Sequence, residues 1–118
     1  MSFDPGQVYQ PAEDTFLLIG AALAEVRCSD FVCEIGCGSG AVSVAVMGRC
    51  GGLVAVDINP HAVACARERG VDAVLGDMFS PFGEGVLFDL ILFNAPYLPT
   101  LPEERVDDWL EYALGGGV

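Results

Sequence analysis

The sequence predicts an α/β fold, a parallel sheet whose strands lie in the order 3-2-1-4. Short apolar runs alternate with helix-like segments, which is the pattern of strand–helix–strand units with right-handed crossovers. The second run, residues 53–57, is apolar up to its final aspartate, and the fourth run, residues 88–93, is apolar on both faces, as expected of strands that are covered on both faces. A glycine-rich turn at residues 36–40 joins the first strand to a helix. Ligands of such sheets bind at the carboxyl ends of the strands, so we expect a site there.

The chain has 118 residues, the size of one small α/β domain. We divide it into an N-terminal segment with a helix (1–30), a core with the glycine turn (31–97) and a tail (98–118). The net charge is −12, from 17 acidic and 5 basic residues, so the chain repels phosphate backbones and nucleic acid is an unlikely partner. Because no apolar run is long enough to span a membrane and no signal peptide is evident, we expect a cytoplasmic protein.

The sequence has five cysteines, an odd number, and no two of them form a C-x-x-C pair. This pattern favours free thiols over a disulfide framework, and it predicts no metal site. We expect three of the cysteines to be small buried side chains: Cys28, Cys33 and Cys65.

The first helix is expected to open within residues 9–15. Pro11 suits the first turn of a helix, and the acidic side chains of Glu13 and Asp14 favour its positive end. Further along, apolar residues recur at helical spacing and predict a stripe that faces the core. The members of this stripe are Phe16, Ile19, Leu23 and Val26.

Four strands and two further helices are expected after this first helix. The strands lie at residues 31–35, 53–57, 71–75 and 88–93, and the helices at about 40–48 and 60–69. The last helix has clear boundary signals, because Asn59 suits the N-cap and Pro60 suits the first helical position. His61, the one histidine of the chain, is expected to be a solvated residue of that helix.

The glycine turn has more than one interpretation. Gly36, Gly38 and Ala41 satisfy the G-x-G-x-x-G/A pattern of dinucleotide-binding proteins. Asp57 lies at about the distance expected of the acidic residue that binds a ribose. An NAD-dependent oxidoreductase of the Rossmann type is therefore an alternative, although such an enzyme would need a substrate domain as well.

Two details of the turn favour S-adenosylmethionine instead. The glycines Gly36, Gly38 and Gly40 follow a G-x-G-x-G pattern, and Glu34 lies on the strand just before them. A carboxylate at this place repels a pyrophosphate but suits a cationic ligand. S-adenosylmethionine carries an ammonium and a sulfonium group and no phosphate. A glycine turn with a purely structural role is the remaining alternative.

Acidic residues follow two further strands at the same edge of the sheet. Asp57, which ends the second strand, is expected to accept hydrogen bonds from both ribose hydroxyls, although an aspartate also suits a helix cap. Asp77, after the third strand, is expected to bond an adenine amino group, with Met78 against the ring. Gly76-Asp77 is also common turn chemistry, so an ordinary turn is the alternative here.

The segment Asn94-Ala95-Pro96-Tyr97, at the end of the fourth strand, is the candidate catalytic site. The Asn94 side chain and a neighbouring backbone carbonyl can accept both N–H groups of an amide or amine, which aims the nitrogen lone pair at a methyl donor. Pro96 stiffens the turn, and Tyr97 offers a flat face for stacking. Catalysis would then rest on positioning, without a strong base. An ordinary Asn-x-Pro turn is the alternative.

The sequence resembles the HemK-like class I methyltransferases, most closely the archaeal and eukaryotic type that modifies release factors. The glycine motif is shared by many methyltransferases, whereas the Pro-Ala-Glu-Asp-Thr opening together with the Asn-x-Pro-Tyr site is far more specific. The matching segments are residues 8–18, 34–40, 57–60, 76–77 and 94–97.

The resemblance implies a Rossmann-like methyltransferase sheet with S-adenosylmethionine as the cofactor. It implies that residues 94–97 hold the target nitrogen, which in this family is the glutamine amide of the Gly-Gly-Gln tripeptide in a peptide-chain release factor. Lysine and DNA adenine nitrogens are alternative targets, and the acidic charge counts against DNA. The cofactor contacts that the resemblance implies are Thr15, Glu34, Gly36, Asp57, Asp77, Met78 and Asn94.

The sequence departs from the family pattern at two places. Ala95 replaces the first proline of Asn-Pro-Pro-Tyr, which keeps the backbone carbonyl but reduces rigidity. The later strands of the fold are missing after the fourth strand, so we expect a partial, C-terminally truncated domain. A truncated domain that only binds a cofactor or a partner is therefore an alternative function, and the chain alone is expected to be marginally stable, to self-associate and to have little activity.

A protein partner is expected at the third strand, residues 71–75. This strand is short, mostly apolar and at the edge of the predicted sheet, which suits pairing with another chain. The resemblance implies that the partner is a small zinc-binding activator subunit, because family members of this type often work with one.

Overall fold

The computed structural model describes residues 3–8 and 11–94 of the chain. Its elements are, in order, η1 (Pro5–Gln7), α1 (Glu13–Glu25), β1 (Phe31–Ile35), α2 (Ala41–Met47), β2 (Gly52–Asp57), α3 (Pro60–Glu68), β3 (Ala73–Leu75) and β4 (Leu90–Phe93). Within this part of the chain, no helix combines the length and the apolar character needed to cross a membrane. The predicted tail, 98–118, lies outside the described residues.

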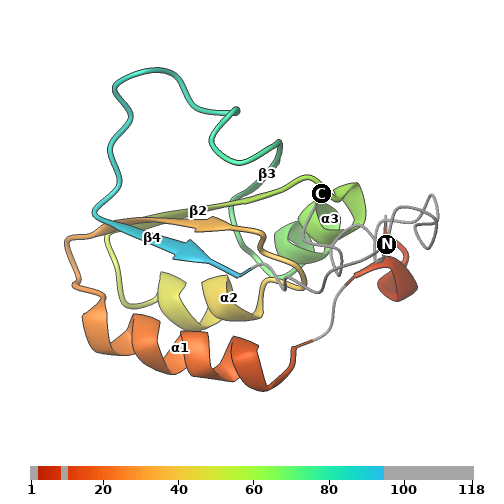
Figure 1. Cartoon of the computed structure of the whole chain (residues 1–118), viewed down its shortest axis with the longest axis horizontal. Coiled ribbons are helices and arrows are strands. Elements are labelled where there is room, and N and C mark those ends of the chain that lie inside the picture. Colours follow the sequence, from red (N-terminus) through yellow and green to blue (C-terminus); the bar gives the residue numbers. More distant parts are fainter. Residues whose placement is uncertain (1–2, 9–10, 95–118) are drawn as a thin grey trace, which may run out of the picture.

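The strands form a parallel sheet in the order β3-β2-β1-β4, so the predicted order is confirmed (Figure 1). β1 lies between β2 and β4, and its Glu34 is aligned with Ala55 on one side and with Leu92 on the other. The chain moves outward from β1 to β3 and then returns past β1 to form β4. The reversal between β1 and β4 is a switch point, where α/β folds place their ligands.

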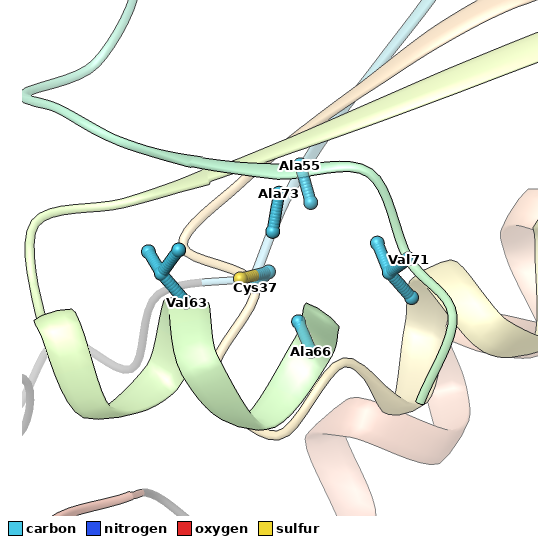
Figure 2. Packing of buried hydrophobic residues seen from close by; sticks show 6 residues of the cluster. All are labelled: Cys37, Ala55, Val63, Ala66, Val71 and Ala73. Carbon is cyan, nitrogen blue, oxygen red and sulfur yellow. The ribbon is translucent and has the colours of Figure 1, made fainter. Parts of the chain in front are cut away.

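The three α-helices cover one face of this sheet. Val32 of β1 lies in a core cluster with residues of α1 and α2. Glu34 lies on the same side of β1 as Val32, and its neighbour in β2 is Ala55. Ala55 in turn belongs to a cluster with residues of α3. Because side chains two positions apart along a strand share a face, α3 lies on the same side as the other two helices. Figure 2 shows how α3 presents Ala66 toward Ala55 and Ala73.

The opposite face of the sheet is covered by the connection between β3 and β4, which lies on the other side of the sheet from α1 and α2 in Figure 1. Two of its aromatic residues, Phe82 and Phe88, pack against a buried cluster of β1 and β2. The ring of Phe88 lies 5.0 Å from that of Phe31 and 5.1 Å from that of Phe82. The sequence pattern does not indicate this aromatic cluster, because its rings come from separate segments.

The helix α1 begins later than predicted. Its N-cap residue is Ala12, and Pro11 lies outside the helix instead of in its first turn. Ala12 is extended, with φ −138° and ψ −174°, so helical geometry starts only at Glu13. Glu13 and Asp14 occupy the first turn, as the sequence predicts.

The predicted apolar stripe of α1 is correct except at its first member. Ile19, Leu23 and Val26 pack against the core around the buried Ala22. Phe16 is instead 62% exposed. At about 100° per residue, Phe16 lies about 120° around the helix from Ala22, which takes its side chain off the buried face.

β3 and β4 are shorter than predicted. β3 begins at Ala73, because the N–H of Val71 still bonds to the carbonyl end of α3. β4 begins at Leu90 and is an edge strand of the described sheet. Its side chains Ile91 and Phe93 are 41% and 49% exposed, so the prediction that this strand is covered on both faces is wrong for the described part of the chain.

The cysteines differ in their burial from the prediction at one position. Cys33 is buried and Cys65 is partly buried, but Cys28 is exposed. Cys28 lies in the turn between α1 and β1, and such turns run over the surface because their backbone groups need water. Cys37, in the glycine turn, is buried as well.

Candidate functional site

The glycine turn leads from β1 into α2 at the carboxyl edge of the sheet. Gly36, Gly38 and Gly40 have φ angles of 81°, 53° and 86°, a region that residues with side chains rarely adopt. A Cβ atom at Gly40 would lie 3.2 Å from the Cα and Cβ atoms of Ala66, so glycine also allows α3 to approach the turn. The N–H of Gly36 donates to the carbonyl of Val56, which fixes the turn to β2.

Asp57 ends β2 beside the glycine turn. Its Oδ2 atom accepts a hydrogen bond from the N–H of Gly38 at 3.0 Å, and its Oδ1 atom accepts one from the N–H of Asn59 at 2.9 Å. Burial raises the pKa of the Asp57 carboxyl, and the backbone hydrogen bonds from Asn59 and Gly38 oppose this rise. The carboxyl group therefore connects the glycine turn to the start of α3.

Glu34 lies next to the turn and is fully buried, with 0% exposure. Its Oε1 atom accepts a hydrogen bond from the hydroxyl of Ser43 in α2, at 2.5 Å. Burial is the main cause that raises the pKa of Glu34, and the charge of Asp57 adds to this rise. Hydrogen bonds with Ser43 and Asn94 oppose it, and the resulting pKa is about 7. Its Oε2 atom has no partner of hydrogen-bonding geometry among the described residues. A buried carboxyl group with one open acceptor suits a cationic ligand.

Thr15 lies in the first turn of α1 and is 2% exposed. Its hydroxyl oxygen makes no hydrogen bond within residues 3–8 and 11–94. Leaving a buried polar group unpaired costs roughly 1–3 kcal/mol, so this hydroxyl also indicates a missing partner. Thr15 Oγ1 and Glu34 Oε2 are the buried side-chain oxygens that the described chain leaves unpaired.

Asn94 follows β4 directly and lies at the switch point of the sheet. Its N–H donates to the carbonyl of Ile35 at 3.0 Å, which fixes it beside the end of β1. Its side chain also lowers the pKa of Glu34. The structure thus brings Asn94, Glu34 and the glycine turn to one edge, as predicted. Outside the described residues lie the other members of the predicted catalytic segment, Ala95, Pro96 and Tyr97.

Asp77 and Met78 follow β3 at the same edge, because the N–H of Gly76 donates to the carbonyl of Asp57 at 3.0 Å. The N–H of Asp77 donates to the hydroxyl of Ser80, whose N–H donates back to the Asp77 carbonyl. These bonds form an ordinary turn, the alternative that the sequence leaves open. Met78 is 44% exposed with a φ of 54°, so both side chains are accessible and their predicted adenine contacts stay predictions.

The first turn of α3 holds the N-terminal segment, residues 3–8, which the sequence does not predict. Asn59 caps α3 as expected, by accepting from the N–H of His61 at 2.9 Å, and its Nδ2 group also donates to the carbonyl of Gln7 at 2.7 Å. His61 Nδ1 accepts from the N–H of Asp4 at 3.1 Å, so this partly buried histidine is not simply a solvated residue.

Ser43 is the residue of the site that sequence reasoning missed. It is fully buried on α2 and is the one polar side chain in the run Ala41–Met47. A lone hydroxyl within an apolar helix is the signal that indicates it. Its partner Glu34 is not evident from the sequence, because the contact depends on how α2 packs on β1.

The matched family model and the two curated relatives described below are named as methyltransferases. Residues 32–114 match the family model described as a methyltransferase domain. A Methanocaldococcus jannaschii protein, provisionally named a protein N5-glutamine methyltransferase, is 43% identical over 119 residues, covering 94% of this chain and 58% of the relative. Methyltransferase HEMK2 of Mus musculus is 39% identical, covering 93% of this chain and 58% of the relative. The chain thus spans a little more than half the length of these relatives.

Solved structures show the same fold. The Mtq2–Trm112 complex of E. cuniculi, described as responsible for methylation of the eRF1 translation termination factor, aligns with a TM-score of 0.70 and 27% identity, covering 81% of this chain and 56% of that chain. The N-methyltransferase NodS of Bradyrhizobium japonicum, solved with S-adenosyl-L-homocysteine, aligns with a TM-score of 0.56 and 28% identity, covering 67% of this chain and 42% of that chain.

These matches agree with the site and favour S-adenosylmethionine over NAD as the cofactor of the glycine turn. The matched family is one of methyltransferases, and the NAD-dependent alternative has no support among the relatives described above. The chain belongs to the methyltransferase-domain family, and within it the chain is similar to the HemK-like methyltransferases, as its sequence predicts.

Proposed function

We propose that this chain carries an S-adenosylmethionine-dependent N-methyltransferase that acts on the glutamine amide in the Gly-Gly-Gln motif of a peptide-chain release factor. The observation that carries the proposal is the buried Glu34 beside the glycine turn, whose Oε2 atom has no hydrogen-bond partner among the described residues. The names of the N5-glutamine methyltransferase relative and of the eRF1-modifying complex support the substrate. Because release factors act in translation, the proposal includes a cytoplasmic location.

The residues at the sheet edge fit this cofactor in three ways. Gly36, Gly38 and Gly40 let the backbone come close to a ligand. A carboxylate has about four acceptor positions; Asp57 accepts from the N–H groups of Gly38 and Asn59, and positions that these bonds do not use are available to ribose hydroxyls. The unpaired oxygens of Thr15 and Glu34 complete the set as partners for polar or cationic groups of the methionine portion.

The proposed adenine contacts are Asp77 and Met78. They follow β3 at the edge to which Asp57 also belongs, and both are accessible. When it is bound, the cofactor supplies an electrophilic methyl group. The remaining task of the chain is to orient the nitrogen that receives it.

Asn94 is proposed to perform this task. Its side-chain carbonyl oxygen accepts one N–H of the target amide, and a backbone carbonyl of the segment 94–97 accepts the other, which fixes the direction of the nitrogen lone pair. Ala95 retains the carbonyl that the proline of the family provides, and Tyr97 offers a stacking face. No strong base is required, because the proton on the methylated nitrogen becomes acidic and leaves afterwards.

The proposal includes a second protein partner at β3. No strand pairs with the outer side of β3 in the described sheet, and Leu75 of this strand is 56% exposed. An exposed strand edge suits pairing with another chain. The relative in the Mtq2–Trm112 complex has a partner, which supports one here, and we propose a small zinc-binding activator subunit on the family resemblance.

Two measurements test the proposed function. Calorimetric titration of the full chain should detect binding of S-adenosylmethionine and none of NAD; failure to bind S-adenosylmethionine refutes the function. Transfer of a radiolabelled methyl group to a Gly-Gly-Gln protein should fall by ~10²–10³ in Asn94→Ala, with only a mild loss of cofactor affinity. Undiminished transfer by that variant refutes the role of Asn94.

A second candidate function is binding without transfer. It is the alternative that the sequence leaves open, and the chain spans 58% of the length of these relatives. Binding of S-adenosylmethionine without transfer to a release factor, a lysine or an adenine acceptor identifies this alternative. Transfer to lysine or adenine instead of the glutamine amide would keep the enzyme class and change the substrate.

A further inference from the structure

We propose that Ser43 is a positioning residue for Glu34, which holds the carboxyl group so that its Oε2 atom receives the ammonium group of the cofactor. This inference rests on the proposed function and adds to it a residue that the family motifs do not include. Both side chains have 0% exposure, so their arrangement is determined by the fold and not by solvent.

The hydroxyl of Ser43 has a single proton, and it donates that proton to Glu34 Oε1 at 2.5 Å. This distance belongs to charge-assisted hydrogen bonds between a hydroxyl and a carboxylate. The bond assigns different tasks to the two carboxyl oxygens. Oε1 is engaged by the protein, whereas Oε2 has no partner of hydrogen-bonding geometry among the described residues.

Within residues 3–8 and 11–94, the groups that act on the Glu34 carboxyl include no cation. Asp57 at the end of β2 adds a like charge, and Ser43 and Asn94 contribute neutral dipoles. The thiols of Cys33 and Cys37 lie near enough to sense the carboxyl charge, and their own pKa values are raised by burial, so they stay uncharged. Among the described residues, no Lys, Arg or His is one of the groups that shift the pKa of Glu34, so a cationic ligand would supply a counter-charge that this part of the chain does not.

The pair also couples ligand binding to a proton. Burial raises the pKa of Glu34 to about 7, so near neutrality the ligand-free carboxyl is partly protonated. A carboxyl group that pairs with an ammonium must give up that proton, so affinity for an ammonium-bearing ligand rises as the pH increases through about 7. Ser43 lowers the pKa of Glu34, so removing its hydroxyl moves this rise to higher pH.

The test compares two ligands on the full chain. S-adenosylhomocysteine carries the ammonium group, whereas 5′-methylthioadenosine lacks the whole amino-acid portion. In calorimetric titrations at pH 7, Ser43→Ala should bind S-adenosylhomocysteine roughly tenfold more weakly, as expected for a hydrogen bond to a charged group, and 5′-methylthioadenosine about equally well. Between pH 5.5 and 8.5, the rise in affinity for S-adenosylhomocysteine should shift upward in the variant, and affinity for 5′-methylthioadenosine should stay flat.

The matched control is Ser29→Ala, which removes the same hydroxyl from an exposed turn and should change neither ligand. If Ser43→Ala does not fold, Ser43→Cys retains a donor, though a weaker one on a slightly larger atom, and should show the same upward shift to a smaller extent. Equal losses for both ligands, or an unchanged pH profile, overturn the positioning role while the proposed function stands. Failure of the parent chain to bind either ligand refutes the proposed function itself.

Discussion

The Oδ2 atom of Asp57 accepts a hydrogen bond from the N–H of Gly38 at 3.0 Å, across 19 residues of sequence. This bond joins the end of one strand to the turn that follows its neighbour. The other carboxyl oxygen of Asp57, Oδ1, accepts a hydrogen bond from the N–H of Asn59 at the start of α3. One carboxyl group therefore supports both loops that border the proposed cofactor site, so its substitution should affect binding and stability together.

Asp57→Ala should weaken binding of S-adenosylmethionine by roughly 1.5–3 kcal/mol, because charge-assisted bonds to the ribose are lost. It should also lower the free energy of unfolding, since the N–H groups of Gly38 and Asn59 lose their acceptor. Asp57→Asn keeps one acceptor oxygen and should fall between the parent and the alanine variant. Titration calorimetry and urea unfolding measure the two effects, and unaltered affinity in Asp57→Ala would contradict the ribose assignment.

Glu34→Gln should stabilise the ligand-free chain at alkaline pH. The pKa of Glu34 is raised to about 7 in the folded state by burial, so the stability that its protonated form contributes is present below about pH 4.5 and is lost as the pH rises through about 7. Glutamine carries no charge to bury. The gain should therefore grow from near zero at pH 4.5 to as much as ~3 kcal/mol at pH 8. Urea unfolding at both values checks this, and a pH-independent difference would be evidence against it.

Gly40→Ala should destabilise the fold by roughly 1–3 kcal/mol. The position has a φ of 86°, and a Cβ atom would lie 3.2 Å from the backbone of Ala66 in α3. The matched control is Gly20→Ala in α1, where no atom lies within 4 Å of the added Cβ and the helix favours alanine by about 0.5–1 kcal/mol. Thermal melting should therefore move in opposite directions for the two variants, and a shared direction would disprove the steric argument.

Asn59→Ser should release the N-terminal segment without uncapping α3. Serine retains an acceptor for the N–H of His61, but it lacks the Nδ2 group that donates to the Gln7 carbonyl at 2.7 Å. Asn59→Ala removes both interactions and should cost about 1 kcal/mol more through loss of the cap. Hydrogen exchange at residues 7 and 8 should accelerate in both variants; protection equal to the parent in Asn59→Ser would show that the bond does not hold the segment.

The sequence predicts most of the strands, helices and strand order of this molecule, because these depend on local residue patterns. Mostly apolar runs indicate the strands, and their alternation with helices leads to the strand order. The cap at Asn59 and the turn at Gly36–Gly40 follow from residue types with one dominant use. Glu34, Asp57 and Asn94 come together as predicted, because each lies within one residue of the carboxyl end of a parallel strand and such ends share an edge.

What the sequence does not predict are contacts that depend on how elements pack. The bond between Ser43 and Glu34 requires a helix to lie at one angle on a strand, and the bond between His61 and Asp4 spans 57 residues. Periodicity alone includes Phe16 in the buried stripe, although the approach of α1 to the sheet is centred on Ala22. Local patterns contain no information on such angles, so these features come only from the structure.

The reversal of the sheet at β1 also has a consequence for the order in which the molecule forms. The sheet neighbours β1, β2 and β3 are consecutive strands, each joined to the next by one helix. The pairing of β1 with β4 instead joins residues far apart in the sequence, since the N–H of Phe31 bonds to Asp89 across 58 residues. The entropy of closing a loop grows with its length, so we expect the three-strand unit to assemble first on the emerging polypeptide and β4 to dock afterwards. Asn94 follows β4 directly, so it reaches its place only when β4 docks. The part of the site that would orient the target nitrogen is therefore completed after the part that would hold the nucleoside.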